Sequence, residues 1–306
     1  MDAPLPMLME SYLTAIATKA TGTRDAYRRV LRDFNLWLMT KPGNASGFTP
    51  DQFTQTAVTV YLEELQTRGY SRSHRARVKA VISSFARYLI EEQGLLRRNP
   101  TREISLPPVA ALAPRELSPD QRFVLRSLVE REGTTRGAAI FSLGYWAGCR
   151  VSDVAWLEMA ALHISPKAGW MTVGHKGGKQ RTIDLHNDAR RLLFDHLACN
   201  TLSTERRYVF PSQRSARLTE AGIHHWFRSL KALATKTEWE LIVDITFHDL
   251  RHDFAHRARA AGWNLEEVAY YLGHLTKTGL PAIQTTVRYT QVSREHVKPK
   301  LHQIRG

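Results

Sequence analysis

A proline-rich stretch about a third of the way along the chain divides the sequence into two parts. The segment RRNPTREISLPPVAALAPREL contains four prolines and has no sustained hydrophobic periodicity, which indicates an extended connection. We place this linker at residues 106–116, so the expected domains are residues 1–105 and 117–306. With 306 residues, 43% of them hydrophobic, each part can bury a core of its own.

The part before the linker is expected to be helical throughout. Apolar residues recur at helical spacing in four segments, residues 8–19, 23–38, 51–65 and 71–94. We expect Thr23 to cap the second helix and Asp51 to begin the third. The fourth is expected to start near Ser71.

Two of these helices carry basic residues on one side. Such faces suit the phosphate backbone of DNA, although ordinary solvated helix surfaces have a similar composition. The residues predicted to contact DNA in this part are Arg24, Arg28, Arg72, His74, Arg75, Arg77 and Lys79.

The whole chain is strongly basic, with a formal net charge of +14. This balance favours a polyanionic partner, most often nucleic acid, with salt-sensitive binding. The two cysteines give neither a disulfide framework nor a zinc-ligand spacing, and no apolar stretch reaches the roughly 20 residues that span a bilayer. We therefore expect a cytoplasmic, nucleoid-associated protein with no membrane partner, no metal and no cofactor.

The part after the linker is predicted to combine helices with a small β-sheet. Helical patterns begin at Ser118 and near Ser152, and others cover residues 134–146, 187–197, 219–234, 245–262 and 265–272. The segment GWMTVGHKGGKQRTIDL predicts two short strands around a turn rich in glycine and lysine. The expected fold class is mainly α with a small β-sheet in the second domain.

Five short motifs in the chain contain side chains that can act on a phosphate. They are AGCRVSDVAWL with Arg150, GHKGGKQR with Lys176, HDLRH with His248 and Arg251, LGH with His274, and RYTQV with Tyr289. Taken singly, each is commonplace, because such residues are usually surface, capping or packing groups. In this order, from about residue 118 to 292, they resemble the motifs of the tyrosine recombinase (phage integrase) family.

The chemistry of these residues agrees with the resemblance. A tyrosine that attacks a phosphodiester needs positive charge around the phosphorus, and Arg150 and Arg251 can supply permanently charged, fork-shaped donors. His274 could add a third donor. His248 lies one helical turn before Arg251, so both share a face, and it could take the tyrosine proton or bind the phosphate.

The leaving 5′-oxygen of deoxyribose needs a proton, and a lysine in the predicted turn can donate it. The resemblance favours Lys176 as this general acid, and Lys179 is the rival. Lys179 and Arg228 are also predicted to contact DNA, and Asp153 is expected to orient Arg150 or another residue of the motifs.

The resemblance implies a helical core-binding domain followed by a mixed α/β catalytic domain that together clamp DNA. It implies site-specific recombination through a 3′-phosphotyrosine and a Holliday junction, without metal or ATP, to integrate, excise or resolve a mobile element or replicon. The implied partner is double-stranded DNA with paired half-sites, bound by a homotetramer whose C-terminal tails, residues 293–306, contact neighbouring protomers.

Two other functions remain open from the sequence. One is a nicking-closing enzyme similar to type IB topoisomerases, and the other is an architectural DNA-binding protein without catalysis. The chain also departs from the family pattern, because His274 and Tyr289 are separated by LTKTGLPAIQTTVR, longer than usual. This insertion could let the tyrosine segment move or carry a partner contact.

Overall fold

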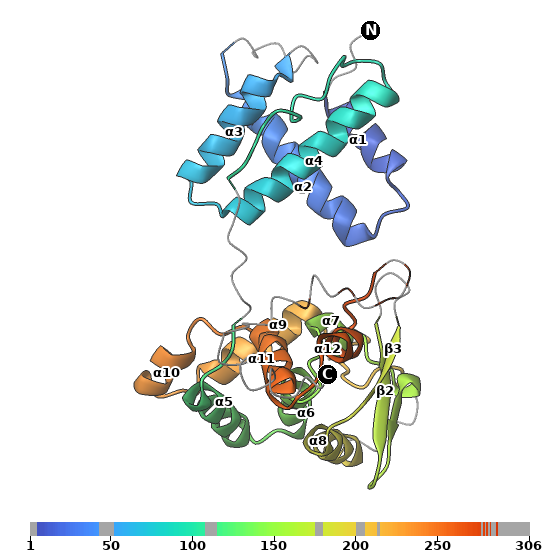
Figure 1. Ribbon diagram of the computed structural model, residues 1–306, viewed down its shortest axis with the longest axis vertical. Helices are drawn as coiled ribbons and strands as arrows, with labels where there is room; N and C mark the ends of the chain where they lie inside the picture. The colour runs from blue at the N-terminus through green and yellow to red at the C-terminus, as the bar shows by residue number, and fades with distance from the viewer. Residues whose placement is uncertain are drawn as a thin grey trace, which may run out of the picture. The chain divides into compact units, whose positions relative to one another are not determined.

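The computed structural model divides the chain into two compact units, Met1–Ala110 and Ala111–Gly306 (Figure 1). The structure describes residues 5–42, 52–107, 115–174, 180–199, 206–212 and 215–276, together with residues 278, 280, 282 and 286. The linker expected at 106–116 includes the division between the units, and residues 108–114 lie outside the described residues.

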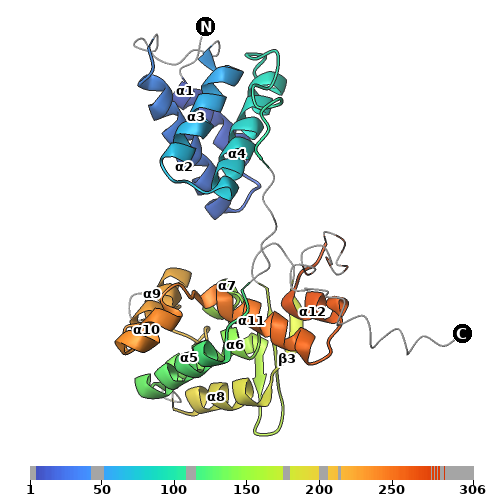
Figure 2. The same cartoon turned by 60° about the vertical axis from the view of Figure 1, so that its left-hand side comes forward.

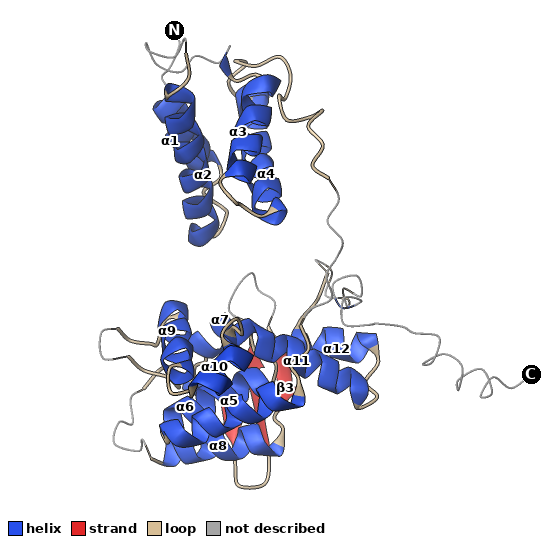
Figure 3. Cartoon of the chain, turned by 90° about the vertical axis from the view of Figure 1, so that its left-hand side faces the viewer, coloured by secondary structure: helices blue, strands red, loops and turns tan. Residues whose placement is uncertain are grey.

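The described part of the first unit consists of helices. They are α1 (Leu5–Ala15), α2 (Thr21–Met39), α3 (Gln55–Thr67) and α4 (Arg72–Glu91) (Figure 3). All four turn their apolar sides to one core, in which Leu31, Val58, Ile82 and Leu89 are almost completely buried. The helical prediction for this part is confirmed.

The starts of these helices correct two expectations. Thr23 does not cap the second helix, since α2 begins at Thr21 after Ala20, which makes no side-chain cap hydrogen bond. The third helix is capped by Thr54, whose hydroxyl accepts from the backbone N–H of Ala57, so α3 starts after the predicted Asp51. Ser71 caps α4 as the sequence predicts.

The second unit combines helices with one small sheet. In chain order it contains α5 (Pro119–Glu132), α6 (Thr135–Tyr145), α7 (Val151–Ala155), the 3-10 helix η2 (Met159–Ala161), β1 (Leu162–Ile164), β2 (Gly169–Val173), β3 (Arg181–Asp184), α8 (Asn187–Ala198), α9 (Glu220–Lys231), α10 (Lys236–Ile242), α11 (Phe247–Ala260) and α12 (Leu265–Leu272). The strands form an antiparallel sheet in the order β1-β2-β3. Figure 1 labels β2 and β3 of this sheet. The expected fold class, mainly α with a small β-sheet, is confirmed.

Helix α6 lies at the centre of the second unit and packs against α5, α8 and α11 (Figure 2). Its residues Ile140 and Leu143 are fully buried. Gly144 lets α11 approach closely, because a Cβ there would lie only 2.9 Å from the ring of Phe247. This packing anchors the beginning of α11, which carries His248 and Arg251.

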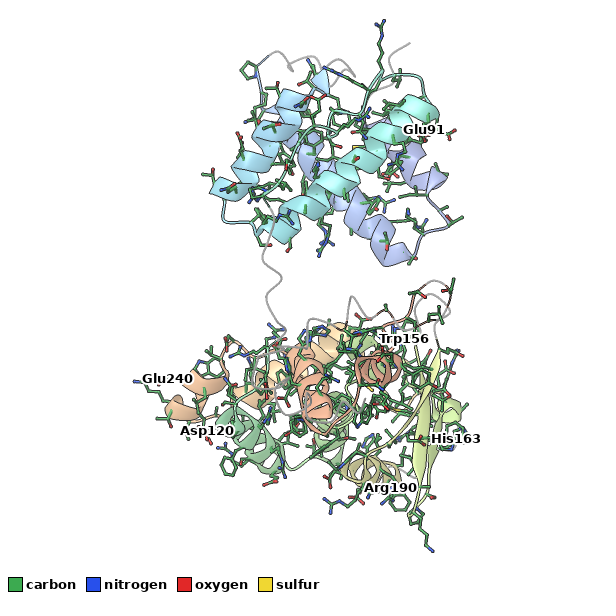
Figure 4. The ribbon with its side chains drawn as sticks, viewed as in Figure 1. Glu91, Asp120, Trp156, His163, Arg190 and Glu240 are labelled. Atoms are coloured by element: carbon green, nitrogen blue, oxygen red, sulfur yellow. The ribbon has the colours of Figure 1, made fainter. Side chains whose placement is uncertain are left out.

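Helix α8 also braces the sheet. Nη1 of Arg190 donates to the backbone carbonyl of Ser165, just after β1, at 3.0 Å. Figure 4 labels Arg190 on this helix and His163 on β1. In the part of the chain that the structure describes, none of the helices is both long enough and apolar enough to span a membrane.

Three features of the second unit differ from the sequence prediction. Ser152 is not a cap: Arg150 is the N-cap of α7, and its N–H donates to the Asp153 carboxylate at 3.1 Å. Strand β1 was missed, because three residues are too few to show a period. Helix α10 was also missed, although Thr235 and Glu238 form a capping box with the expected spacing.

Candidate active site

Arg251 lies at the centre of the candidate site, in the second turn of α11. Its side chain is buried, with 1% of the residue exposed. Nη1 donates to the carbonyl of Gly148 and Nη2 to the carbonyl of Leu272, both at 2.7 Å. These carbonyls offset the loss of hydration that a buried guanidinium suffers, and they fix its plane.

Arg150 lies beside Arg251 and is held in a similar way. It follows Gly148, whose φ of 58° belongs to the left-handed region, and it precedes the first turn of α7. Its Nη2 donates to the carbonyl of Gly273 at 3.1 Å, while 36% of its side chain stays exposed. Arg150 and Arg251 therefore bind adjacent carbonyls at the C-terminal end of α12, where helix carbonyls lack helical partners and the helix dipole is negative.

His274 follows Gly273 in the chain and connects Arg251 to Thr286 through its two ring nitrogens. Its Nε2 lies 3.0 Å from Nη2 of Arg251, and its Nδ1 lies 3.1 Å from the hydroxyl of Thr286. A guanidinium can only donate, so Nε2 accepts and the ring proton is on Nδ1, which donates to Thr286. Burial, and then the charges of Arg251 and Arg150, lower the pKa of His274 to about 3, so the ring is neutral near pH 7.

His248 lies one turn before Arg251 on α11. Although part of the residue reaches solvent, desolvation of the ring, followed by the charge of Arg251, lowers its pKa. Its ring meets that of His252 edge to face, with centroids 4.4 Å apart. Burial, and then His248, lower the pKa of His252 to about 4. The lowered pKa favours the neutral ring of His248, which can accept a proton.

The structure thus brings together Arg150, His248, Arg251 and His274. Lys176, Lys179 and Tyr289 lie outside the described residues, so their roles stay predictions. Asp153, buried at 5% exposure, accepts the backbone N–H of Arg150, and its orienting role stays a prediction.

The residues predicted to contact DNA have varied surroundings in the first unit. Arg28 and Arg77 are exposed, and Arg24 is half-buried. Arg72 donates to the carbonyl of Leu106, and Lys79 donates to the carbonyl of Ile104. Arg75 is buried and donates to the side chain of Gln66 at 2.7 Å. The ring of His74 stacks on the ring of Tyr70. In the second unit, Arg228 is exposed on α9. Contact with DNA stays a prediction for all of them.

Two residues near the site were missed by the sequence analysis. Thr286, fully buried, receives the His274 hydrogen bond, and no local pattern marks it. Arg181 is buried at the start of β3 and bonds both Asp153 and the carbonyl of Tyr271. A signal for Arg181 existed, since it shares the inward face of its strand with Ile183.

Comparison with known proteins identifies the family of this chain. The model of the phage integrase family matches residues 119–296, more than half of the chain. The tyrosine recombinase XerD of Bradyrhizobium diazoefficiens is 30% identical and covers 97% of this chain and 94% of its own length. The chain belongs to the phage integrase family. It is a tyrosine recombinase, an enzyme of the class that breaks and rejoins DNA strands.

More distant matches also cover most of this chain. The tyrosine recombinase XerC of Neisseria gonorrhoeae is 25% identical and covers 94% of this chain and 92% of its own. Two solved structures share the fold. The Tn1549 transposon integrase in complex with transposon right-end DNA matches with a TM-score of 0.74 and 16% identity over 98% of this chain and 99% of that one. The lambda integrase tetramer bound to a Holliday junction matches with a TM-score of 0.70 and 15% identity over 96% and 80%.

Proposed function

We propose that this protein is a site-specific recombinase that cleaves and rejoins DNA through a 3′-phosphotyrosine on Tyr289. The observation that carries the proposal is the pair of guanidiniums of Arg150 and Arg251 on adjacent carbonyls of one helix end, next to the neutral His274. Two such forks suit the non-bridging oxygens of a phosphodiester, on which negative charge builds in the transition state.

In the proposed first step, the Tyr289 hydroxyl attacks the phosphorus and the bond to the 5′-oxygen breaks. The tyrosine proton passes to His248 or to water, and Lys176, or its rival Lys179, gives a proton to the leaving 5′-oxygen. In the second step, the 5′-hydroxyl of another strand attacks the phosphotyrosine and releases Tyr289. The phosphoester linkage is conserved throughout, so the exchange consumes no ATP.

We assign the two domains different tasks in this reaction. Residues 1–105 bind the recombination half-site, residues 117–306 catalyse strand exchange, and residues 293–306 contact a neighbouring protomer. Four protomers on two duplexes would exchange strands in pairs through a Holliday junction, for integration, excision or resolution of a mobile element or replicon. Support for this assembly comes from the shared fold with a lambda integrase tetramer bound to such a junction.

The test is covalent trapping on a nicked duplex library with randomised sequence around the nick. Cleavage near a nick releases a short oligonucleotide that diffuses away, so the phosphotyrosine cannot religate and the protein stays on the DNA. We expect an adduct on denaturing gels with the wild type and none with Tyr289→Phe. Tyr270→Phe, a change at an exposed tyrosine of α12, is the matched control and should form the adduct.

The outcome separates the three functions. An adduct whose captured sequence then supports crossed products between two sites establishes recombination. An adduct that only relaxes supercoiled DNA points to the topoisomerase-like activity. Retained DNA binding without any adduct from the wild type would favour the architectural function and overturn the proposal.

A further inference from the structure

The end of α12 binds a third arginine that has no part in the proposed phosphate site. Three consecutive carbonyls accept from three guanidiniums: Tyr271 from Nε of Arg181 at 2.7 Å, Leu272 from Arg251 at 2.7 Å, and Gly273 from Arg150 at 3.1 Å. Arg181 comes from β3, so the sheet and the two phosphate-binding arginines meet at the same helix end.

Arg181 shares a carboxylate with Arg150. Its Nη2 lies 3.2 Å from Oδ2 of Asp153, and both side chains are buried, at 3% and 4% exposure. The same Oδ2 accepts the backbone N–H of Arg150 at 3.1 Å and lies 4.0 Å from Nη1 of Arg150. Arg181 is therefore the nearer cation to the carboxylate, and the guanidinium of Arg150 stays at the limit of ion-pair distance.

Gly273 brings Arg181 into contact with the backbone that holds Arg150. Its φ of +68° favours glycine, and a Cβ there would lie 2.9 Å from Cδ and Nη1 of Arg181. The residue whose carbonyl holds Arg150 thus packs directly on Arg181.

We propose that Arg181 is a positioning residue that sets Arg150 for the phosphate. Arg181 balances the buried charge of Asp153, so the carboxylate does not draw the Arg150 guanidinium away from the DNA. The physical reason is that a buried carboxylate left without its partner is strongly destabilised and recruits the nearest cation. This proposal rests on the proposed function, because it takes Arg150 to bind the scissile phosphate.

The first experiment is a double-mutant cycle on adduct formation with the nicked duplex that the trapping selects. We expect Arg181→Met to slow adduct formation about 100-fold, the scale of one lost transition-state donor, with DNA affinity changed by less than about 3-fold. Asp153→Asn keeps an oxygen that can accept the Arg150 N–H but removes the charge. Added to Arg181→Met, it should recover at least about 10-fold of the loss.

The control is Arg207→Met in the same unit. The Arg207 side chain is 71% exposed and pairs with Glu158, so this change should leave adduct formation at the wild-type rate. A double variant as slow as Arg181→Met would mean that Arg181 acts only through folding, and would overturn the proposal. Wild-type cleavage by Arg181→Met would overturn it as well.

A second readout needs no DNA cleavage. Phenylglyoxal modifies accessible guanidiniums, and peptide mass spectrometry reports the rate at Arg150 alone. We expect Arg181→Met to slow modification of Arg150 several-fold, because Asp153 then holds it, and the double variant to restore it. If the wild type forms no adduct on any sequence, the proposed function fails, and this rate still decides whether Arg181 positions Arg150: an unchanged rate overturns the proposal.

Discussion

The basic residues of the first unit and those of the candidate site are held by different kinds of partner. Arg28 of the first unit is half-exposed and pairs with the exposed carboxylates of Glu10 and Asp25 at 3.5 and 3.3 Å. In the second unit, Arg251 is buried and bonded to two carbonyls at 2.7 Å. Exposed ion pairs contribute little to stability, so their arginines can give up the carboxylate and bind phosphate instead. A buried guanidinium that is bonded to rigid backbone is already oriented before the DNA binds.

This contrast predicts which property changes when a cation is removed: the cleavage rate and stability, or DNA binding. Changes in the buried network should slow cleavage and reduce stability together, because the same hydrogen bonds do both. Changes on the exposed faces should weaken binding and its salt dependence and leave the chemical step alone. The four predictions below test this division, from the largest expected effect to the smallest.

Arg251→Lys should have the largest effect. Lysine keeps the charge but cannot reach the Gly148 carbonyl, the Leu272 carbonyl and His274 with one fork. We expect adduct formation to fall at least about 100-fold, and the free energy of unfolding to drop by about 1–3 kcal/mol for each carbonyl left unpaired. Trapping kinetics and urea denaturation measure the two effects. A variant close to wild type in both would contradict the distinction between the buried cations of the site and the exposed cations of the first unit.

Gly273→Ala should destabilise the second unit more than Gly262→Ala does. Both glycines have positive φ, +68° and +95°, so both changes carry backbone strain of about 1–2 kcal/mol. Only the Cβ at position 273 meets Arg181, at 2.9 Å, and nothing lies within 4 Å of a Cβ at position 262. We expect a further loss of about 1–3 kcal/mol for Gly273→Ala in urea denaturation. Equal losses would show that the Arg181 side chain can move away from the added Cβ without a loss of stability.

The pH dependence of stability should report the neutral His274. Its pKa is about 3 in the folded protein, against about 6.5 in the unfolded chain. Its contribution is therefore complete above pH 6.5, and it is lost as the pH falls towards 3, because only the unfolded chain binds the proton. The loss approaches about 1.4 kcal/mol per pH unit near pH 5.

His274→Gln tests this sign. We expect the unfolding free energy of the variant to fall less steeply than that of the wild type between pH 6.5 and pH 5, with close to one proton fewer taken up on unfolding. Leu233→Gln, which changes an exposed side chain of the second unit without an ionisable group, is the control and should keep the wild-type slope. Parallel slopes for His274→Gln and wild type would contradict a neutral, partly buried ring.

Exposed arginines of the first unit should give the smallest effects. Arg77→Ala is expected to weaken DNA binding less than about 10-fold and to reduce the slope of log K against log salt by about one, because each such residue releases about one counterion. The cleavage rate of the bound complex should not change. Arg191→Ala, at an exposed arginine of α8, serves as the comparison, and an equal effect there would remove the special role of the first unit.

Local sequence patterns predicted most of the architecture. Helical spacing placed the long helices of both units, and Ser71 and Ser118 mark helix starts because capping depends on a few neighbouring residues. Three of the five motifs predicted Arg150, His248, Arg251 and His274 as one site, and the structure brings these residues together. The other two motifs carry Lys176 and Tyr289, which lie outside the described residues. The sequence did not predict the shortest elements, such as the three-residue strand β1. Thr23 and Ser152 show that a residue type typical of helix caps does not by itself determine where a helix begins.

The chain's own sequence determined its periodicity, its basic balance and the order of its motifs. Only the tertiary structure decided that the C-terminal end of α12 would collect three arginines on Tyr271, Leu272 and Gly273. Those hydrogen bonds join residues distant in the sequence, so no local pattern encodes them. They form because the carbonyls at the end of a helix lack helical partners, and the guanidiniums that fold against them lose much of their water, so each group takes the other as its partner.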